Sequence, residues 1–244
     1  MKKTRLLLIV MVAALLVSLL PSAAPAVAKT QVGYNWTRTL RQGMSGADVK
    51  ELQIRVAGWA ASSPSRTYIS LDGDFGPATK AAVIRFQTAY GLDPDGVVGP
   101  ATQAVLNSLE SADGSTAHFN WSEFYSHDGS GFSGGKVSEA TVKENVRRLM
   151  YKLEALRVKA GNNSITINSG FRSIAHNRAV GGATNSQHLY GIAADIVVRN
   201  RSVSQVIALA KTCGFSGIIR YDTFTHVDSR IEYPYGSQTW YWAD

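Results

Sequence analysis

The spacing of apolar residues divides the chain into a helical first part and a mixed second part. Between residues 38 and 109, apolar positions recur at helical spacing in three short segments, and Pro77 and Pro100 open the second and third of them. Proline is favoured in the first turn of a helix, where its missing N–H costs nothing. Three short helices joined by tight turns predict a small three-helix domain over residues 38–109.

A longer apolar stripe follows Ser138. Its members alternate in steps of four and three residues, as on one face of a helix: Val142, Val146, Leu149, Leu153 and Leu156. Beyond it the pattern becomes typical of strands, with short runs at 164–168, 191–198, 218–221 and 225–228. A helical run ended by Gly214 lies between the second and third runs. This order predicts an α+β domain in which an antiparallel sheet is flanked by helices.

The first domain contains an internal repeat. The segment 71–79 returns 23 positions later as 94–102, and both copies contain Asp-Gly-x-x-Gly-Pro-x-Thr. Each copy is typical of a turn followed by a helix start. The segment has no cluster of metal ligands and no nucleophile with a base, which indicates a binding or spacer module rather than a second enzyme. The repeated motif resembles the three-helix peptidoglycan-binding module of cell-wall hydrolases. This resemblance implies binding to glycan or stem peptides, and the alternative is that the module only holds the second domain away from the wall.

Residues 1–28 are typical of a secretory signal peptide. A basic start is followed by the apolar run Leu6–Leu20 and by the small-x-small cleavage motif at 26–28. The apolar run is shorter than the roughly 20 residues that span a bilayer. We therefore expect a secreted or wall-associated protein without membrane attachment after cleavage. The small, polar residues 110–117 are expected to link the first domain to a second domain at 118–244.

Composition narrows the possible partners. Three of the 25 basic residues lie in the expected signal peptide, which leaves 22 basic against 18 acidic residues and a net charge of +4. No cluster of Lys and Arg accompanies this mild excess, so nucleic acid is not an expected partner. Cys213 is the single cysteine, which excludes an internal disulfide. Its position in a helical run predicts a small buried side chain rather than a catalytic thiol.

Two histidines and one aspartate of the second domain could form a catalytic zinc site. His188 precedes the predicted strand 191–198, Asp195 lies on that strand, and His226 lies on another. A carboxylate in such an apolar strand is costly to bury unless it is paired or bound to a metal. Two imidazoles and one carboxylate leave a fourth position for water, as in catalytic rather than structural zinc sites. Each histidine alone is more commonly structural, and the combination with Asp195 favours the metal site.

The motif Ser-x-His-x-x-Gly-x-Ala-x-Asp at 186–195, followed by His-x-Asp at 226–228, resembles the zinc D-alanyl-D-alanine peptidases. This group shares its zinc core with lysostaphin-type endopeptidases and the hedgehog signalling domain. The resemblance spans about residues 118–230 and includes Ser-Gly-Phe-Arg-Ser at 169–173.

The resemblance implies the fold of that group and one zinc ion per chain, with His188, Asp195 and His226 as the ligands. It also implies a substrate-binding role for Arg172. Physically, a guanidinium beside a zinc site offers a fork for a carboxylate or a developing oxyanion. The alternative role of Arg172 is a salt bridge that orders its own loop.

The sequence leaves the general base open. Many members of the group have Glu or Asp three residues before the last histidine ligand, and this chain has Thr223 there. Asp222, on the expected turn, and Asp228, on the same strand face as His226, are the main candidates, and His176 is a weaker one that could instead cap or pack. Asp228 could instead orient His226 from outside the metal's own ligand set. Ser186 could hold the substrate backbone or order its own loop.

These observations predict a secreted zinc peptidase, acting as a monomer on the stem peptides of peptidoglycan. Zinc-bound water, a carboxylate that takes its proton and Arg172 beside the oxyanion are the parts of such a hydrolysis. Release of terminal D-alanine by a D-Ala-D-Ala carboxypeptidase is the simplest reaction. An endopeptidase that cuts cross-links or L,D-type bonds would use the same residues. A non-catalytic wall-binding protein is the alternative from another functional class.

Overall fold

The computed structural model describes residues 33–244, and the expected signal peptide lies outside these described residues. The described part begins with helices that enclose a core of their own. They are α1 (Ala47–Val56), the 3-10 turn η1 (Ala57–Trp59), α2 (Pro77–Ala89) and α3 (Pro100–Ser108). Pro77 and Pro100 each occupy the first turn of their helix, as the sequence predicts.

A buried glutamine closes each copy of the repeated turn. Gln53 of α1 donates to Asp72 Oδ1 at 2.7 Å and accepts from the backbone N–H of Gly73 at 2.8 Å. Gln87 of α2 makes the same pair of contacts in the second copy, with Asp95 Oδ1 at 3.0 Å and with the backbone of the glycine that follows it at 2.9 Å. Gly73 has a φ of 81°, a conformation that glycine adopts without strain. The sequence repeat is therefore a repeated hydrogen-bonded turn.

The second part of the chain forms a five-stranded sheet in the order β1-β2-β4-β3-β5. The strands are β1 (Ile165–Ser169), β2 (Ala193–Val198), β3 (Gly217–Arg220), β4 (Thr225–Asp228) and β5 (Tyr241–Ala243). The first four strands pair antiparallel, which confirms the predicted α+β class with an antiparallel sheet. β5 differs, because it pairs parallel with β3 at the sheet edge. The long connection through residues 229–240 allows this crossover.

Helices and short 3-10 turns fill the connections between the strands. They are α4 (Glu139–Lys159), α5 (Ile174–Ala179), α6 (Val203–Ala210), η2 (Trp121–Phe124), η3 (Gln187–Tyr190) and η4 (Arg230–Glu232). α6 follows the end of β2, as the apolar spacing of the sequence predicts. α5 and η3 both precede β2, and this stretch carries much of the candidate site described below.

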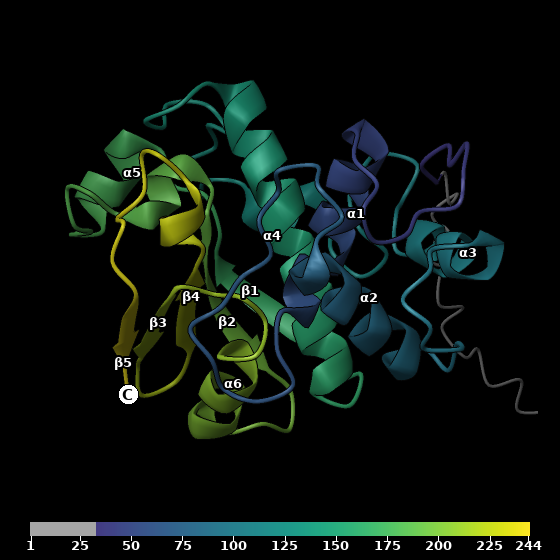
Figure 1. The fold of residues 1–244 in the computed structure, drawn as a ribbon. Coiled ribbons are helices and arrows are strands. Elements are labelled where there is room, and N and C mark those ends of the chain that lie inside the picture. Colours follow the sequence, from purple (N-terminus) through teal and green to yellow (C-terminus); the bar gives the residue numbers. More distant parts are fainter. Residues whose placement is uncertain (1–32) are drawn as a thin grey trace, which may run out of the picture.

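α4 contributes to two cores. Its predicted apolar stripe, from Val142 to Leu156, is buried in the core that includes the sheet. Tyr151 and Ala155, on another face of the helix, are buried together with the N-terminal helices. Figure 1 shows α4 between the sheet and those helices. A single long helix with two buried faces therefore joins the two parts of the molecule.

Polar contacts and close packing hold the N-terminal helices against α4. Arg147 Nη2 of α4 donates to Glu51 of α1 at 3.0 Å, and Lys159 Nζ donates to the carbonyl of Gly58 at 3.0 Å. Gly58 permits this approach, because a Cβ there would lie only 2.4 Å from the Cβ of Ala155. The two parts are thus packed directly on each other.

The expected linker at 110–117 forms a closed turn. The backbone N–H of Ser111 donates to the carbonyl of Ser115 at 2.9 Å, and Glu110 pairs with Thr116 in an isolated bridge. Ser111, Ser115 and Thr116 are all buried. The segment is therefore ordered, unlike a flexible polar tether, while the domain limits themselves stay a prediction. Among the described residues, no helix has the length and apolar character needed to cross a bilayer.

Candidate metal centre

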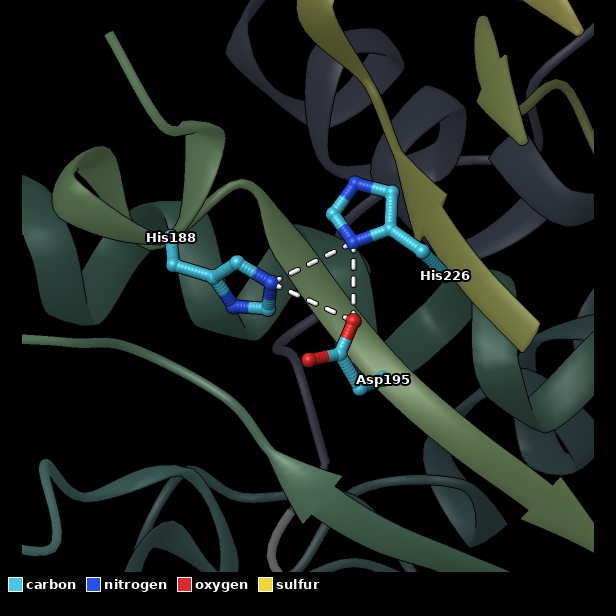
Figure 2. A group of neighbouring side chains, drawn as sticks. All are labelled: His188, Asp195 and His226. Carbon is cyan, nitrogen blue, oxygen red and sulfur yellow. Dashed lines mark hydrogen bonds and ion pairs between the residues drawn. The ribbon is translucent and has the colours of Figure 1, made fainter. Parts of the chain in front are cut away.

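Three side chains that are far apart in the sequence converge over the sheet. Figure 2 shows both imidazoles and the carboxylate of His188, Asp195 and His226 directed toward a common centre. His188 Nε2 lies 3.2 Å from His226 Nδ1 and 3.3 Å from Asp195 Oδ1, and the last two atoms are 2.8 Å apart. A tetrahedral zinc ion with bonds of about 2.0–2.1 Å holds its ligand atoms about 3.3 Å apart. The donor types and their spacing therefore fit one such ion after small adjustments.

Strand register and a glycine turn bring the three residues together. Asp195 on β2 and His226 on β4 are direct partners across the two strands. His188 lies on η3, which ends at Gly191 with a φ of 72°. A Cβ at Gly191 would lie 2.9 Å from Cγ1 of Val142 on α4. Glycine therefore permits the sharp return of the chain from η3 into β2, both by its φ and by its size.

A backbone carbonyl fixes the outer nitrogen of His188. Nδ1 of this imidazole lies 2.6 Å from the carbonyl oxygen of Gly170. Because a carbonyl oxygen can only accept, Nδ1 carries the hydrogen of the neutral ring. The lone pair of Nε2 is then available at the centre of the cluster, where a metal ion would bind.

A buried carboxylate fixes the outer nitrogen of His226. Its Nε2 lies 3.1 Å from Asp228 Oδ2, and Asp228 is completely buried. Arg230 in turn donates to Asp228 from Nε at 2.9 Å, from Nη2 at 2.5 Å and from its backbone N–H at 2.9 Å. A carboxylate on the outer nitrogen of an imidazole is a recurrent way to orient a histidine toward a metal.

Hydrogen bonds and neighbouring charges shift the pKa values of the buried histidines and aspartates of the cluster. Burial disfavours protonation of His226, but hydrogen bonds to Asp195 and Asp228 outweigh it and raise the pKa of His226 to about 9. Burial lowers the pKa of His188, so this ring is neutral at pH 7. Burial alone would raise the pKa of the two carboxyls. The pKa of Asp195 is nevertheless held well below its usual range by the two imidazoles, and that of Asp228 by His226 and Arg230.

Arg172 borders the cluster on the side of Asp195. Its Nη2 donates to Asp195 Oδ2 at 2.6 Å, and its Nε donates to Ser169 Oγ at 2.8 Å. Its backbone N–H also donates to the carbonyl of His188 at 3.1 Å. Arg172 thus combines the ordering contact and the position beside the cluster that the sequence offered as alternatives.

The cluster opens into a pocket of about 450 Å³. Its walls come from η3 and the loop before it, from the β3–β4 hairpin and from two arginines: Arg172, Val180, Gly181, Gly182, Ala183, Asn185, Ser186, Gln187, His188, Asp195, Ile219, Tyr221, Phe224, His226 and Arg230. Ser186 is part of this wall. Neither candidate base lines the pocket: Asp222 is exposed on the β3–β4 turn, and Asp228 is buried beside His226.

Sequence reasoning gave no site role to several residues of this pocket, among them Tyr221, Phe224 and Arg230. Tyr221 and Phe224 stack on each other across the β3–β4 turn, with ring centroids 4.3 Å apart. Arg230 follows Asp228 by two residues. On a strand this spacing would place both side chains on one face, which could have indicated Arg230, although it lies just beyond the end of β4. A larger cavity of about 550 Å³ lies between α2, α4 and α6, and none of its lining residues is His, Cys, Asp or Glu.

Comparisons with known proteins agree with this geometry. Residues 117–228 match the family model described as peptidase M15, and residues 45–106 match the model of a peptidoglycan-binding domain. A zinc D-Ala-D-Ala carboxypeptidase from Streptomyces albus G is 43% identical over 201 residues, which cover 80% of this chain and 77% of that protein. An uncharacterized protein from Kitasatospora aureofaciens is 41% identical over 100 residues, covering 39% of this chain and 79% of that protein.

Among solved structures, a peptidoglycan-binding protein from Clostridioides difficile, in complex with glutamine hydroxamate, is 40% identical over 30% of this chain and 42% of its own, with a TM-score of 0.25. The predicted peptidoglycan-binding module is confirmed by its family model. The resemblance to D-alanyl-D-alanine peptidases is confirmed by a relative that shares most of its length with this chain. The chain therefore belongs to the peptidase M15 family.

Proposed function

We propose that this protein is a zinc-dependent D-Ala-D-Ala carboxypeptidase that removes the terminal D-alanine from peptidoglycan stem peptides. The observation that carries the proposal is the convergence of two imidazole nitrogens and one carboxylate oxygen at the wall of a pocket. The activity printed for the Streptomyces albus G relative, 43% identical over most of both chains, supports the choice of substrate. A neighbouring peptidoglycan-binding domain fits a substrate that is part of the cell wall.

His188 Nε2, His226 Nδ1 and Asp195 Oδ1 are the proposed zinc ligands, because their outer nitrogens and the second oxygen are already engaged elsewhere. A zinc ion bound there would supply a Lewis acid and a water of lowered pKa. We expect one ion per chain. Since all three ligands come from a single chain, the proposed enzyme is complete as a monomer.

The remaining residues have positioning roles in this proposal. The Arg172 guanidinium, held by Asp195, lies where it can donate to the carbonyl oxygen of the scissile bond as negative charge develops. Asp228 orients His226, a role that its burial and its contacts favour over that of a general base. Ser186 at the pocket wall is proposed to hold the substrate backbone. Asp222 has no proposed role, because it does not line the pocket.

We place the enzyme outside the cell, at the wall, because its proposed substrate is there and residues 1–28 are typical of a signal peptide. Release of the chain after signal cleavage, with no membrane attachment, is part of the same proposal. The domain limits 38–109 and 118–244 are proposed as the wall-binding module and the peptidase domain. They approximate the ranges matched by the two family models.

Digestion of purified peptidoglycan and of soluble stem peptides tests the function. Mature protein should release D-alanine from pentapeptide stems, and a chelator should stop the release until zinc is added back. Mass spectrometry of the digest separates the alternatives. Products cut within cross-links or at an L,D-type bond would replace the carboxypeptidase with an endopeptidase. Intact peptides after incubation with zinc-loaded protein at high concentration would indicate a non-catalytic wall-binding protein.

A further inference from the structure

Two guanidinium groups flank the candidate metal centre. Arg172 bonds directly to Asp195, and Arg230 bonds to Asp228, which in turn bonds to His226. Both arginines line the same pocket, and their side chains are 17% and 14% exposed. The cluster therefore has one cationic group on the side of its carboxylate and another on the side of one imidazole.

Arg230 is held rigidly but has donors to spare. Its Nε and Nη2 make the fork to Asp228, and its guanidinium carbon lies 5.3 Å from the ring centre of Tyr241. Among the described residues, Nη1 makes no hydrogen bond. A guanidinium has five N–H donors, so one fixed on one edge can still bind an anion on another. Because the guanidinium is already held in place, less conformational entropy is lost when it binds a ligand.

Each arginine is paired with one carboxylate, Arg172 with Asp195 and Arg230 with Asp228, and among the described residues the pocket lining contains no further acidic side chain. The charged part of this lining consists of Arg172, Arg230, the two histidines and Asp195, and that carboxylate already belongs to the proposed metal site. A metal ion would add further positive charge. The electrostatic complement of such a pocket is an anionic group on the substrate, and a peptide provides one at its C-terminal carboxylate.

We propose that Arg230 binds the C-terminal carboxylate of the substrate and thereby restricts the enzyme to the last peptide bond. This inference rests on the proposed function and deepens it, since it names the residue that separates carboxypeptidase from endopeptidase action. Arg172 contacts a metal ligand directly, which places it beside the reacting carbonyl. Arg230 is removed from the cluster by Asp228 and His226, so it can reach a group beyond the scissile bond.

The test compares two peptides that differ only at the C-terminus. N-acetyl-L-Lys-D-Ala-D-Ala is prepared as the free acid and as the C-terminal amide, and kcat/KM is measured for both with zinc-loaded protein. Wild type should prefer the acid by about 100-fold, the scale of a buried charge-assisted contact. In Arg230→Gln the preference should fall to about threefold or less. Arg230→Lys should keep only part of it, because Lys lacks the planar fork.

A matched variant separates recognition from damage to the metal site. Arg230 also holds Asp228, so its loss is expected to disturb His226. Asp228→Asn disturbs the same histidine and weakens the fork but retains the guanidinium and one acceptor oxygen for it, so it should keep a preference for the acid although its overall rate falls. The ratio of acid to amide, rather than the rate itself, is therefore the readout.

A binding measurement extends the test to protein without metal. NMR titration of zinc-free wild type with N-acetyl-D-Ala-D-Ala should give tighter binding for the acid than for the amide, and Arg230→Gln should remove the difference. Equal use of both peptides by wild type would overturn the proposal for Arg230 while leaving the peptidase function intact. Persistence of the preference in Arg230→Gln would overturn it as well. Failure to hydrolyse either peptide would count against the proposed function, and the titration would still decide the role of Arg230.

Discussion

The two imidazoles of the cluster present different nitrogens to its centre, Nε2 from His188 and Nδ1 from His226. The difference follows from their outer partners, the carbonyl of Gly170 for the first and the Asp228 carboxylate for the second. A neutral carbonyl fixes one tautomer, whereas a carboxylate also stabilises positive charge on its ring. The two histidines should therefore respond differently to mutation and to pH.

Removal of the charge at Asp228 should weaken metal binding. Asp228→Ala leaves Nε2 of His226 without its acceptor, and loss of such a partner typically costs about 10–100-fold in metal affinity. Competition with a chromophoric zinc chelator measures the change. Asp222→Ala is the matched control, because this carboxylate is exposed and should leave zinc affinity unchanged. Unaltered zinc affinity together with abolished turnover in Asp228→Ala would instead make Asp228 the general base.

Zinc binding should release about one proton at pH 7. The metal-free chain has a pKa of about 9 at His226, so its Nδ1 carries a proton that the ion must displace, whereas His188 is already neutral. Zinc affinity should therefore rise with pH and level off near pH 9. The stability of the metal-free protein should change with pH in the opposite direction. The stability gained from protonated His226 is fully present below the ordinary pKa of about 6.5 and is lost as pH rises through about 9.

Calorimetry in buffers of different ionisation enthalpy measures the released protons. Proton release near zero at pH 7 would mean that His226 is neutral before the metal binds. Denaturant melts of the metal-free protein at pH 6 and pH 10 check the opposite trend in stability.

The residues of the cluster could be predicted, but their environment could not. Asp195 within an apolar strand and two histidines in recognisable motifs are local signals. The carbonyl of Gly170 and the side chain of Arg230 become partners only when β1, β2 and β4 pair. The general base could not be predicted for the same reason. The strand pattern shows which face Asp228 lies on, but not that its carboxylate is already hydrogen-bonded to Arg230.

At the scale of elements, Gly191 controls the step from η3 into β2. Gly191→Ala combines a left-handed backbone, at φ 72°, with a Cβ only 2.9 Å from Val142. We expect a loss of about 2–4 kcal/mol in unfolding free energy, measured by urea denaturation. Gly181→Ala is the control, because Gly181 has a similar φ of 71° but a Cβ added there would meet nothing within 4 Å. Equal losses in both variants would show that packing against α4 contributes nothing.

Most elements were predictable from local patterns. The strand at 225–228 has the predicted bounds, and the stripe that follows Ser138 is buried along α4. β5 was not predicted, because three residues are too few for an alternating pattern and their partner, β3, precedes them by more than twenty positions. The second buried face of α4 was also missed, since it depends on docking of the N-terminal helices.

At the scale of the whole molecule, the contact at Gly58 should couple the stability of the two parts. Gly58→Val would press a branched side chain against Ala155 and the backbone of Lys152. We expect a loss of about 1–3 kcal/mol and a split of one thermal transition into two, measured by scanning calorimetry. Gly76→Ala is the control, since its Cβ would meet nothing within 4 Å. A single, unshifted transition in Gly58→Val would show that the two parts are not coupled here.

The sharing of α4 between two cores has a consequence for work on an insoluble polymer. Because α4 packs against both parts of the described chain, the distance between the peptidoglycan-binding domain and the pocket of the metal cluster should be nearly fixed. Such an enzyme would cleave only those stem peptides that lie at this distance from the place where the peptidoglycan-binding domain is bound. The spacing of the wall polymer, rather than the number of uncleaved stem peptides, would then limit how many peptides it can cleave.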